Sequence, residues 1–286
     1  MIAPKPSKAE SRSAARRLAK EAALKLARER GETSSLRLPN EGLSTPLIVR
    51  ATIAKIHELS PQLHGDYLDV GAGNGELIDA VMREFSVRVR ACDYRHDLMT
   101  IENVEVDVVD LDGGRLPYED ASLDLVTCTE VIEHLEHWRA VLREFSRILR
   151  SDGILVISTP NVLSLRSRLR YLFFGFFNLF GPILLEEERH HSTHGHINPV
   201  SYFYLAHALS KAGFSRLSVS VDKLQRRSWI SLALLWLPIR LFSEVCLYKE
   251  RHRYRTLDGR NEPFVREMTT IDLLLGRTII VGCRKP

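Results

Sequence analysis

Short apolar runs alternate with amphipathic stretches along the chain from residue 46 onward. Five of these runs have the length and composition of buried strands: residues 67–70, 87–92, 104–109, 123–128 and 154–157. Residues 76–85 and 135–149 lie between them and carry apolar side chains at helical spacing. Strands and helices in this order predict an α/β fold, doubly wound around a mostly parallel sheet.

The regular alternation stops after residue 160. Residues 199–211 predict a further helix, and residues 214–221 and 277–283 predict two further strands. Two apolar insertions, at about 161–197 and 224–276, separate these elements. Each insertion contains an uncharged, aromatic-rich run that is shorter than the ~18 residues needed to cross a bilayer.

The apolar runs of both insertions lie next to arginines, as in helices that rest in the headgroup region of a membrane. The alternative interpretation is that they pack on each other as a cap over the active site. Both interpretations predict an apolar acceptor or an apolar carrier.

Basic residues are concentrated at the start of the chain. Residues 1–40 hold ten Lys and Arg against four Glu, whereas the remaining 246 residues hold 30 basic and 32 acidic side chains. We expect residues 1–40 to form a basic arm, either solvated or in contact with anionic lipid or nucleic acid, and residues 41–286 to form the folded domain. The four cysteines are far apart, and no apolar segment follows the first basic residues, so we predict a cytoplasmic protein that touches the membrane peripherally.

A glycine-rich turn follows the first strand. Gly71, Gly73 and Gly75 are preceded by Asp69 and followed by Glu76. Acidic neighbours disfavour a pyrophosphate and suit a ligand that carries an ammonium group. Asp93 ends the second strand, where its carboxylate can accept hydrogen bonds from two ribose hydroxyls. The pattern predicts a nucleoside ligand.

Four segments carry a family resemblance: residues 67–75, 91–93, 110–118 and 121–126. In order, spacing and placement they resemble the motifs of class I S-adenosylmethionine-dependent methyltransferases. The resemblance implies a Rossmann-like, seven-stranded sheet with an antiparallel last strand, and S-adenosylmethionine as cofactor. It places Asp69, Gly71, Gly73 and Gly75 around the methionine part of the cofactor, Asp93 on the ribose, and Asp110 with Leu111 near the adenine, with Asp112 as a rival to that pair.

A carboxylate and histidine cluster follows the fourth strand. Its Glu-x-x-Glu-His segment, Glu130 to His134, is similar to segments of ubiquinone-biosynthesis O-methyltransferases and of small-RNA 2′-O-methyltransferases. Resemblance to the RNA enzymes implies that Glu130, Glu133, His134 and the later His196 bind Mg²⁺ or Mn²⁺ and so acidify neighbouring hydroxyls. A His134 that acts as general base without a metal, or that merely packs beside the substrate, remains an open alternative.

These features favour S-adenosylmethionine-dependent O-methylation of a small apolar or lipid-linked acceptor. Metal-dependent RNA 2′-O-methylation is an alternative that the histidine cluster and the basic arm support, although the near-neutral body of the chain disfavours nucleic acid as a partner. A non-catalytic, membrane-attached binding protein of the same fold is the second alternative.

Overall fold

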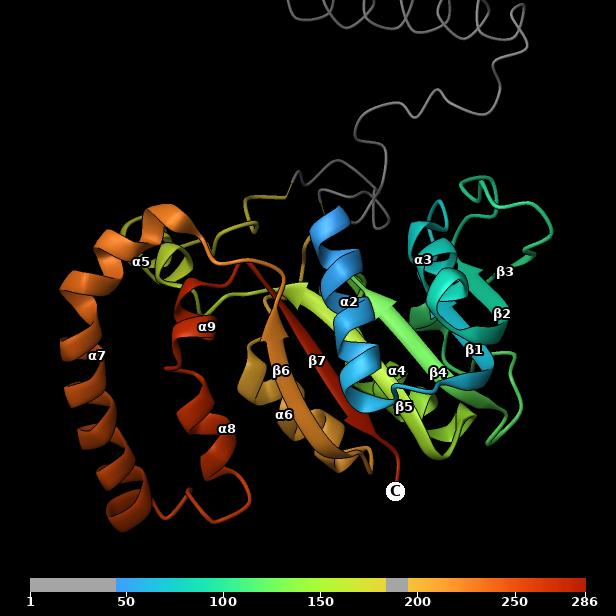
Figure 1. Ribbon diagram of the computed structural model, residues 1–286. Coiled ribbons are helices and arrows are strands. Elements are labelled where there is room, and N and C mark those ends of the chain that lie inside the picture. Colours follow the sequence, from blue (N-terminus) through green and yellow to red (C-terminus); the bar gives the residue numbers. More distant parts are fainter. Residues whose placement is uncertain (1–44, 184–194) are drawn as a thin grey trace, which may run out of the picture. The chain divides into compact units, whose positions relative to one another are not determined.

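A computed structural model describes residues 45–183 and 195–286 of the chain (Figure 1). The predicted basic arm, residues 1–40, lies outside the described residues, as do His190, His191 and His194 of the first insertion.

One seven-stranded sheet organises the domain. Its strands are β1 (His64–Val70), β2 (Ser86–Asp93), β3 (Val106–Val108), β4 (Leu123–Thr129), β5 (Leu149–Pro160), β6 (Ser215–Val221) and β7 (Thr278–Arg284). The spatial order is β3-β2-β1-β4-β5-β7-β6, and β7 runs antiparallel to both of its neighbours. The predicted fold class is confirmed. Because β1 has β2 on one side and β4 on the other, the strand order reverses beside β1, where open sheets of this type bind ligands.

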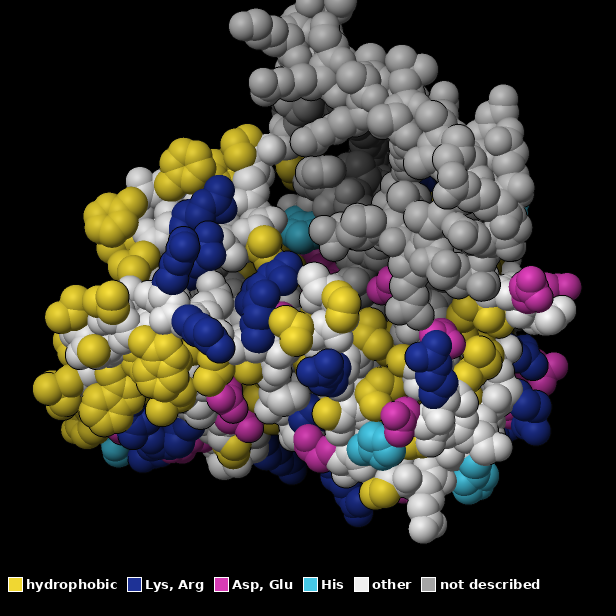
Figure 2. Space-filling view, turned by 45° about the horizontal axis from the view of Figure 1, so that its top comes forward, with side chains coloured by type: hydrophobic (Ala, Val, Ile, Leu, Met, Phe, Trp, Pro, Cys, Tyr) yellow, Lys and Arg dark blue, Asp and Glu magenta, His cyan; other side chains and the backbone are white. Residues whose placement is uncertain are grey.

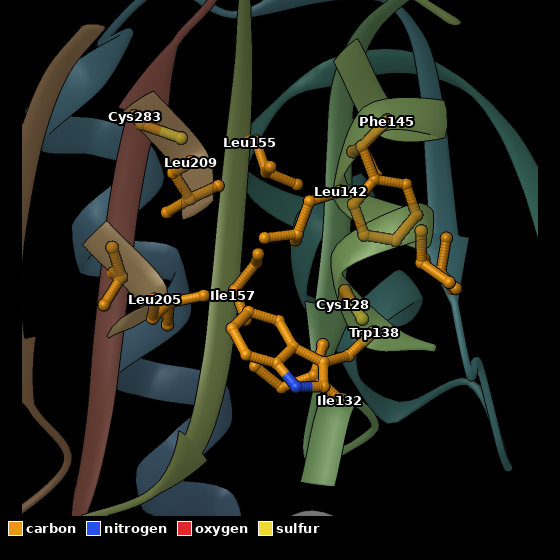
Figure 3. Close-up of a cluster of buried hydrophobic side chains, with 14 of the residues drawn as sticks. Cys128, Ile132, Trp138, Leu142, Phe145, Leu155, Ile157, Leu205, Leu209 and Cys283 are labelled. Carbon is orange, nitrogen blue, oxygen red and sulfur yellow. The ribbon is translucent and has the colours of Figure 1, made fainter. Parts of the chain in front are cut away.

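Helices cover both faces of the sheet. On one face lie α2 (Pro46–Leu59) and α3 (Glu76–Glu84), whose buried side chains form a single apolar cluster with that face. On the other face lie α4 (Trp138–Ile148) and α6 (Tyr202–Lys211). Figure 3 shows this second core, in which Trp138, Leu142 and Phe145 meet side chains of β4, β5 and β7. A core on each face holds the strand ends, and therefore the site, in place.

Two local features differ from the sequence expectations. Helix α2 was not anticipated; only a few of its side chains are fully buried, and one of these is Lys55, whose Nζ bonds to Glu58 Oε2 at 2.7 Å. The helix expected over residues 135–149 begins only at Trp138 and ends at Ile148. Leu149 pairs with Leu123 as the first residue of β5, so sheet pairing outweighs helical spacing at this position.

Helices of the two insertions pack against each other at one end of the sheet (Figure 1). The first contains α5 (Leu165–Phe174), and the second contains α7 (Trp229–Lys249), α8 (Glu262–Glu267) and α9 (Ile271–Leu275). Leu165 of α5 and Leu232 of α7 pack with Leu274 and Leu275 of α9 in a small buried cluster. With its flanking turns, α7 forms one continuous helix that is long and apolar enough to cross a membrane by length and composition.

Candidate functional site

A cavity of about 430 Å³ opens at the carboxyl ends of β1, β2 and β4. This volume falls within the range of roughly 300–1,000 Å³ that is typical of small-molecule sites. Its lining includes Gly71, Gly73, Asp93, Asp110, Leu111, Asp112, Glu130, Val131, His134, Leu135, His196 and Ile197. The structure therefore brings most of the predicted cofactor residues to one cavity, together with Glu130, His134 and His196 of the predicted cluster.

The backbone N–H groups of the glycine turn donate hydrogen bonds to acceptors within the protein. Gly71 and Ala72 both donate to the carbonyl of Cys92, at 2.8 and 3.2 Å. Gly73 donates to Asp93 Oδ2 at 2.8 Å, and Gly75 donates to Ala72 O at 2.9 Å. A pyrophosphate would need these donors to be available. The turn is thus suited to a ligand without phosphates, as its acidic neighbours indicate.

Gly71 must lack a side chain because of a neighbour in the loop after β4. Its φ is +72°, and a Cβ at this position would lie 2.2 Å from Cγ2 of Val131. Val131 belongs to the loop after β4 and lines the cavity. The close approach fixes the glycine turn against the loop that carries Glu130 and Glu133.

Asp93 is poised to bind a diol. Its side chain is almost fully buried, and its carboxylate accepts from Gly73 N at 2.8 Å and from Arg95 N at 3.2 Å. A carboxylate offers about four lone-pair positions, so two remain for hydroxyl donors in the cavity. These contacts orient the carboxylate before the ligand arrives.

The carboxylates of Asp110 and its rival Asp112 differ in their hydrogen bonds. Both line the cavity, but the carboxylate of Asp112 accepts from Glu136 N at 3.1 Å and from His137 N at 2.7 Å. Asp112 therefore links the 3-10 turn Leu111–Gly113 to the loop after β4. Asp110 accepts from Asp112 N through Oδ1 and keeps Oδ2 for a ligand.

Asp69 and Gly75 are not among the residues that line the cavity. Asp69 is buried beneath the glycine turn and accepts from Thr127 Oγ1 at 2.6 Å; Thr127 in turn contacts the hydroxyl of Tyr67 at 2.8 Å. Burial raises the pKa of Asp69 to about 7, the Thr127 hydrogen bond opposes this, and the charge of Asp93 adds to it. Asp69 is therefore a buried residue beneath the glycine turn that does not face the cavity.

Three of the four predicted metal ligands meet in the structure. Ligand atoms of Glu133, His134 and His196 all lie within 4.8 Å of one another. The backbone carbonyl of Glu133 accepts from the N–H groups of Ile197 and Asn198, at 3.0 and 2.9 Å. The end of the first insertion is therefore fastened to the loop after β4, which carries His196 to the site.

The chemistry of this trio fits a cation. Glu133 is fully buried, and its Oε1 has no hydrogen-bond partner, while Oε2 accepts from Thr159 Oγ1 at 3.0 Å. Burial raises the pKa of Glu133 well above its usual value, and the charge of Glu130 adds to this. Nδ1 of His134 donates to the carbonyl of Gly195 at 3.1 Å, which leaves Nε2 as a ligand atom.

Burial, together with His196, lowers the pKa of His134 to about 4. At neutral pH the ring is therefore uncharged, as a metal ligand must be. A base with so low a pKa accepts a proton weakly near pH 7, which favours the ligand interpretation over the general-base interpretation.

Glu130 stands apart from the trio. Its φ is +55°, which is uncommon for a residue with a side chain and typical of functional turns. Its Oε1 accepts from Ser158 Oγ at 3.3 Å, and the residue lines the cavity. Burial raises the pKa of Glu130 to about 7, against the opposing effects of Ser158 and Arg277.

Several supporting residues could not be predicted from the sequence. Thr127 under Asp69, Thr159 beside Glu133, and Phe180 against His196 are all brought in from distant positions by sheet pairing or by the insertion. One signal was available: Tyr94 follows the acidic strand end at Asp93 and lines the cavity. No described residue of the second insertion lines the cavity, and its role as a cap stays a prediction.

Comparisons with known proteins point to methyltransferases. Residues 47–219, more than half of the chain, match the family model described as a methyltransferase domain. A Mycobacterium tuberculosis protein named a probable S-adenosylmethionine-dependent methyltransferase is 38% identical over 104 residues, which cover 34% of this chain and 36% of that protein. A ubiquinone biosynthesis O-methyltransferase of Neisseria meningitidis is 28% identical over 103 residues, or 33% of this chain and 43% of the relative. The matched segments thus span well under half of these curated relatives.

A solved structure shares the fold. A crystal structure of a SAM-dependent methyltransferase from Archaeoglobus fulgidus aligns with a TM-score of 0.51 at 16% identity, and the alignment covers 83% of this chain and 94% of that one. S-adenosylmethionine is the cofactor of the matched family. This cofactor carries positive charge and no phosphate, and the acidic lining of the cavity suits it. By the match over residues 47–219, the chain belongs to the methyltransferase-domain family.

Proposed function

We propose that the protein transfers a methyl group from S-adenosylmethionine to an oxygen atom of a small apolar or lipid-linked acceptor. The observation that carries the proposal is the single cavity that joins Asp93 and the glycine turn to Glu130, His134 and His196. The cofactor supplies a methyl group on a positively charged sulfur. The chain's own residues bind, orient and shield the two reactants.

Asp93 would hold the ribose hydroxyls, and Asp110 with Leu111 would flank the adenine. The acidic side chain of Glu76, which also lines the cavity, would favour the positively charged methionine end of the cofactor. Because the turn's N–H groups are already paired, the loop keeps its shape when the ligand leaves. Such preorganisation places the methyl donor without a further ordering cost.

The acceptor side of the cavity combines apolar and acidic groups. Val131, Leu135 and Ile197 supply apolar surface next to Glu130 and His134. This surface suits an apolar molecule that carries a hydroxyl near the carboxyl of Glu130. The carboxyl could then accept the hydroxyl proton as the oxygen gains the methyl group.

We further propose that Glu133, His134 and His196 hold a divalent cation. Support comes from the unpartnered, buried Oε1 of Glu133 and from the neutral His134 ring, whose proton is directed to Gly195. Two imidazole nitrogens with one carboxylate favour a transition metal such as Mn²⁺ over Mg²⁺. A cation here would lower the pKa of an acceptor hydroxyl that binds to it.

The reaction is tested by following S-adenosylhomocysteine formation with a panel of apolar phenols, each paired with its aniline analogue. Product formed with phenols and not with anilines supports oxygen methylation. Product formed with the anilines alone would contradict the oxygen assignment, and no product from any acceptor would contradict the proposed chemistry.

The cation site is tested by titrating Mn²⁺ into the protein and recording the electron paramagnetic resonance signal of the free ion. We expect one bound Mn²⁺ in the unmodified protein and at least tenfold weaker binding in Glu133→Gln. Asp112→Asn serves as a matched control because Asp112 lines the same cavity outside the trio. Equal binding by the unmodified protein and Glu133→Gln would refute the site.

A further inference from the structure

Large apolar side chains are exposed along α5, the loop that follows it, and α7. We call this the α5/α7 surface, and Figure 2 shows apolar side chains gathered with basic ones on this side of the molecule. Its members are Tyr171, Leu172, Phe173, Phe174, Leu179, Ile183, Trp229, Ile230, Leu234, Trp236, Leu237, Leu241, Phe242, Val245 and Tyr248.

The exposure on this surface is extreme for its residue types. Phe173 is 82% exposed, and Ile230 is 75% exposed. Contiguous apolar surface of this extent marks a place where another body binds. The described parts of the chain leave it uncovered, and within α7 only Leu232 and Leu247 are buried.

The charges beside this surface are mainly basic. In residues 165–183 Arg166 and Arg170 accompany the apolar side chains, and no acidic residue occurs. Arg168 of the same helix points inward and donates to the carbonyls of Leu163 and Met268, which anchors α5 to the domain. At the start of α7, Arg226 and Arg227 are exposed.

We propose that the α5/α7 surface docks the protein on a bilayer that contains anionic lipids. Aromatic side chains with flanking arginines match the boundary between headgroups and acyl chains, where the apolar atoms are buried and the guanidinium groups meet phosphates. A second protein molecule would have to face these arginines with acidic groups, and in the described residues 165–183 and 226–249 the only acidic side chain is Glu244, which pairs with Arg266 at 3.1 Å.

We place α7 on the membrane and not across it, although its length and composition would permit a span. Its uncharged run, residues 228–239, covers only about 18 Å at 1.5 Å per residue, against a hydrocarbon core of ~30 Å, so a crossing helix would carry charged side chains into that core. Arg240 and Glu244 follow it on exposed positions of α7. Leu235 and Ile239 pack toward α9, so one side of the helix stays with the protein.

A chain of contacts links the docking surface to the cavity. Tyr171 stacks on Phe177 with ring centroids 4.4 Å apart, and the guanidinium of Arg170 donates to the carbonyls of Phe177 and Phe180. The Phe180 ring lies 5.3 Å from that of His196, which lines the cavity. An acceptor dissolved in the bilayer would thus meet the site at the membrane surface, a consequence that rests on the proposed function.

The test is cosedimentation of the full-length protein with vesicles. We expect binding to vesicles of phosphatidylglycerol and phosphatidylcholine and much weaker binding to phosphatidylcholine alone. The pair Leu172→Ser/Phe173→Ser and the pair Ile230→Ser/Leu234→Ser should each lower the partition coefficient about tenfold or more, because two apolar side chains no longer enter the bilayer. Arg226→Glu/Arg227→Glu should remove the preference for anionic vesicles.

The matched control is Met82→Ser/Tyr204→Ser, which removes two exposed apolar side chains from α3 and α6. It should bind vesicles like the unmodified protein, and unchanged circular-dichroism melting would show that every variant folds. Unchanged binding by the α5 and α7 variants would overturn the proposal and assign membrane contact to residues 1–40. Light scattering that shows self-association through this surface, with no vesicle binding, would overturn it in favour of a second copy. Vesicle binding needs no methyl transfer, so its outcome is independent of the proposed reaction.

Discussion

The contact between Gly71 and Val131 predicts a specific cost for adding one methyl group to the glycine turn. In Gly71→Ala the new Cβ would lie 2.2 Å from Cγ2 of Val131, and the alanine would have to keep a φ of +72°. The left-handed backbone costs an alanine about 1–2 kcal/mol. Relief of the overlap costs about 1–3 kcal/mol more, since the neighbouring side chain must leave its packed position.

We therefore expect Gly71→Ala to lower the free energy of unfolding by about 2–5 kcal/mol. The two contributions can be separated, because the Cβ of Val131 is 3.6 Å from the position of the added atom, an ordinary contact distance. In a Val131→Ala background the overlap disappears and only the backbone cost of about 1–2 kcal/mol remains.

Urea unfolding of the parent, the two single variants and the double variant measures this coupling as a double-mutant cycle. The reasoning predicts that Val131→Ala offsets about 1–3 kcal/mol of the Gly71→Ala cost. A Gly71→Ala protein as stable as the parent, or two effects that simply add, would refute the packing explanation for this glycine.

Two further predictions concern buried polar groups. The folded-state pKa of Asp69, about 7, lies above its usual 3.8, so its contribution to stability is greatest below pH 4 and is lost as the pH rises through 7. In the parent, ionisation of Asp69 should lower the free energy of unfolding by up to about 4 kcal/mol between pH 4 and pH 8. Asp69→Asn should abolish this pH dependence, and an unchanged pH profile in urea unfolding would contradict the reasoning. Asn161→Ala should destabilise the protein by about 2–4 kcal/mol, because Asn161 Nδ2 donates to the carbonyls of Leu273 and Gly276 at 2.8 and 2.9 Å. A change below 0.5 kcal/mol in thermal unfolding, on the order of an ordinary surface substitution, would argue against that anchor.

Hydrophobic runs predicted the sheet well because each central strand is buried on both faces. Residues 67–70 and 123–128 became the cores of β1 and β4, and the antiparallel β7 followed from the family resemblance. Helix α2 escaped notice because its buried face is sparse and includes Lys55. Element ends were less predictable, since pairing across the sheet moved Leu149 from a helix into β5.

The parts of the site that depend on residue type and spacing were predictable. Which side chains line the cavity and which are buried beneath it was not. Asp93 and Asp110 line the cavity as expected. Asp69 does not, because its partner Thr127 sits beside it in the sheet although 58 residues away in the chain, and the two are buried together. The position of His196 could not be predicted from the sequence. Hydrogen bonds from Ile197 and Asn198 to the Glu133 carbonyl hold the end of the first insertion, and with it His196, beside the cluster.

Cofactor binding tests the central claim most directly. S-adenosylmethionine is titrated into the purified protein by calorimetry, beside Asp93→Ala and the control Asp79→Ala, which removes an exposed carboxylate from α3. The account predicts one equivalent bound by the parent and by Asp79→Ala. It predicts at least a hundredfold loss in Asp93→Ala, about 3 kcal/mol, from the missing hydroxyl and loop contacts. No binding by the parent protein, or equal binding by Asp93→Ala, would contradict the assignment of the cavity.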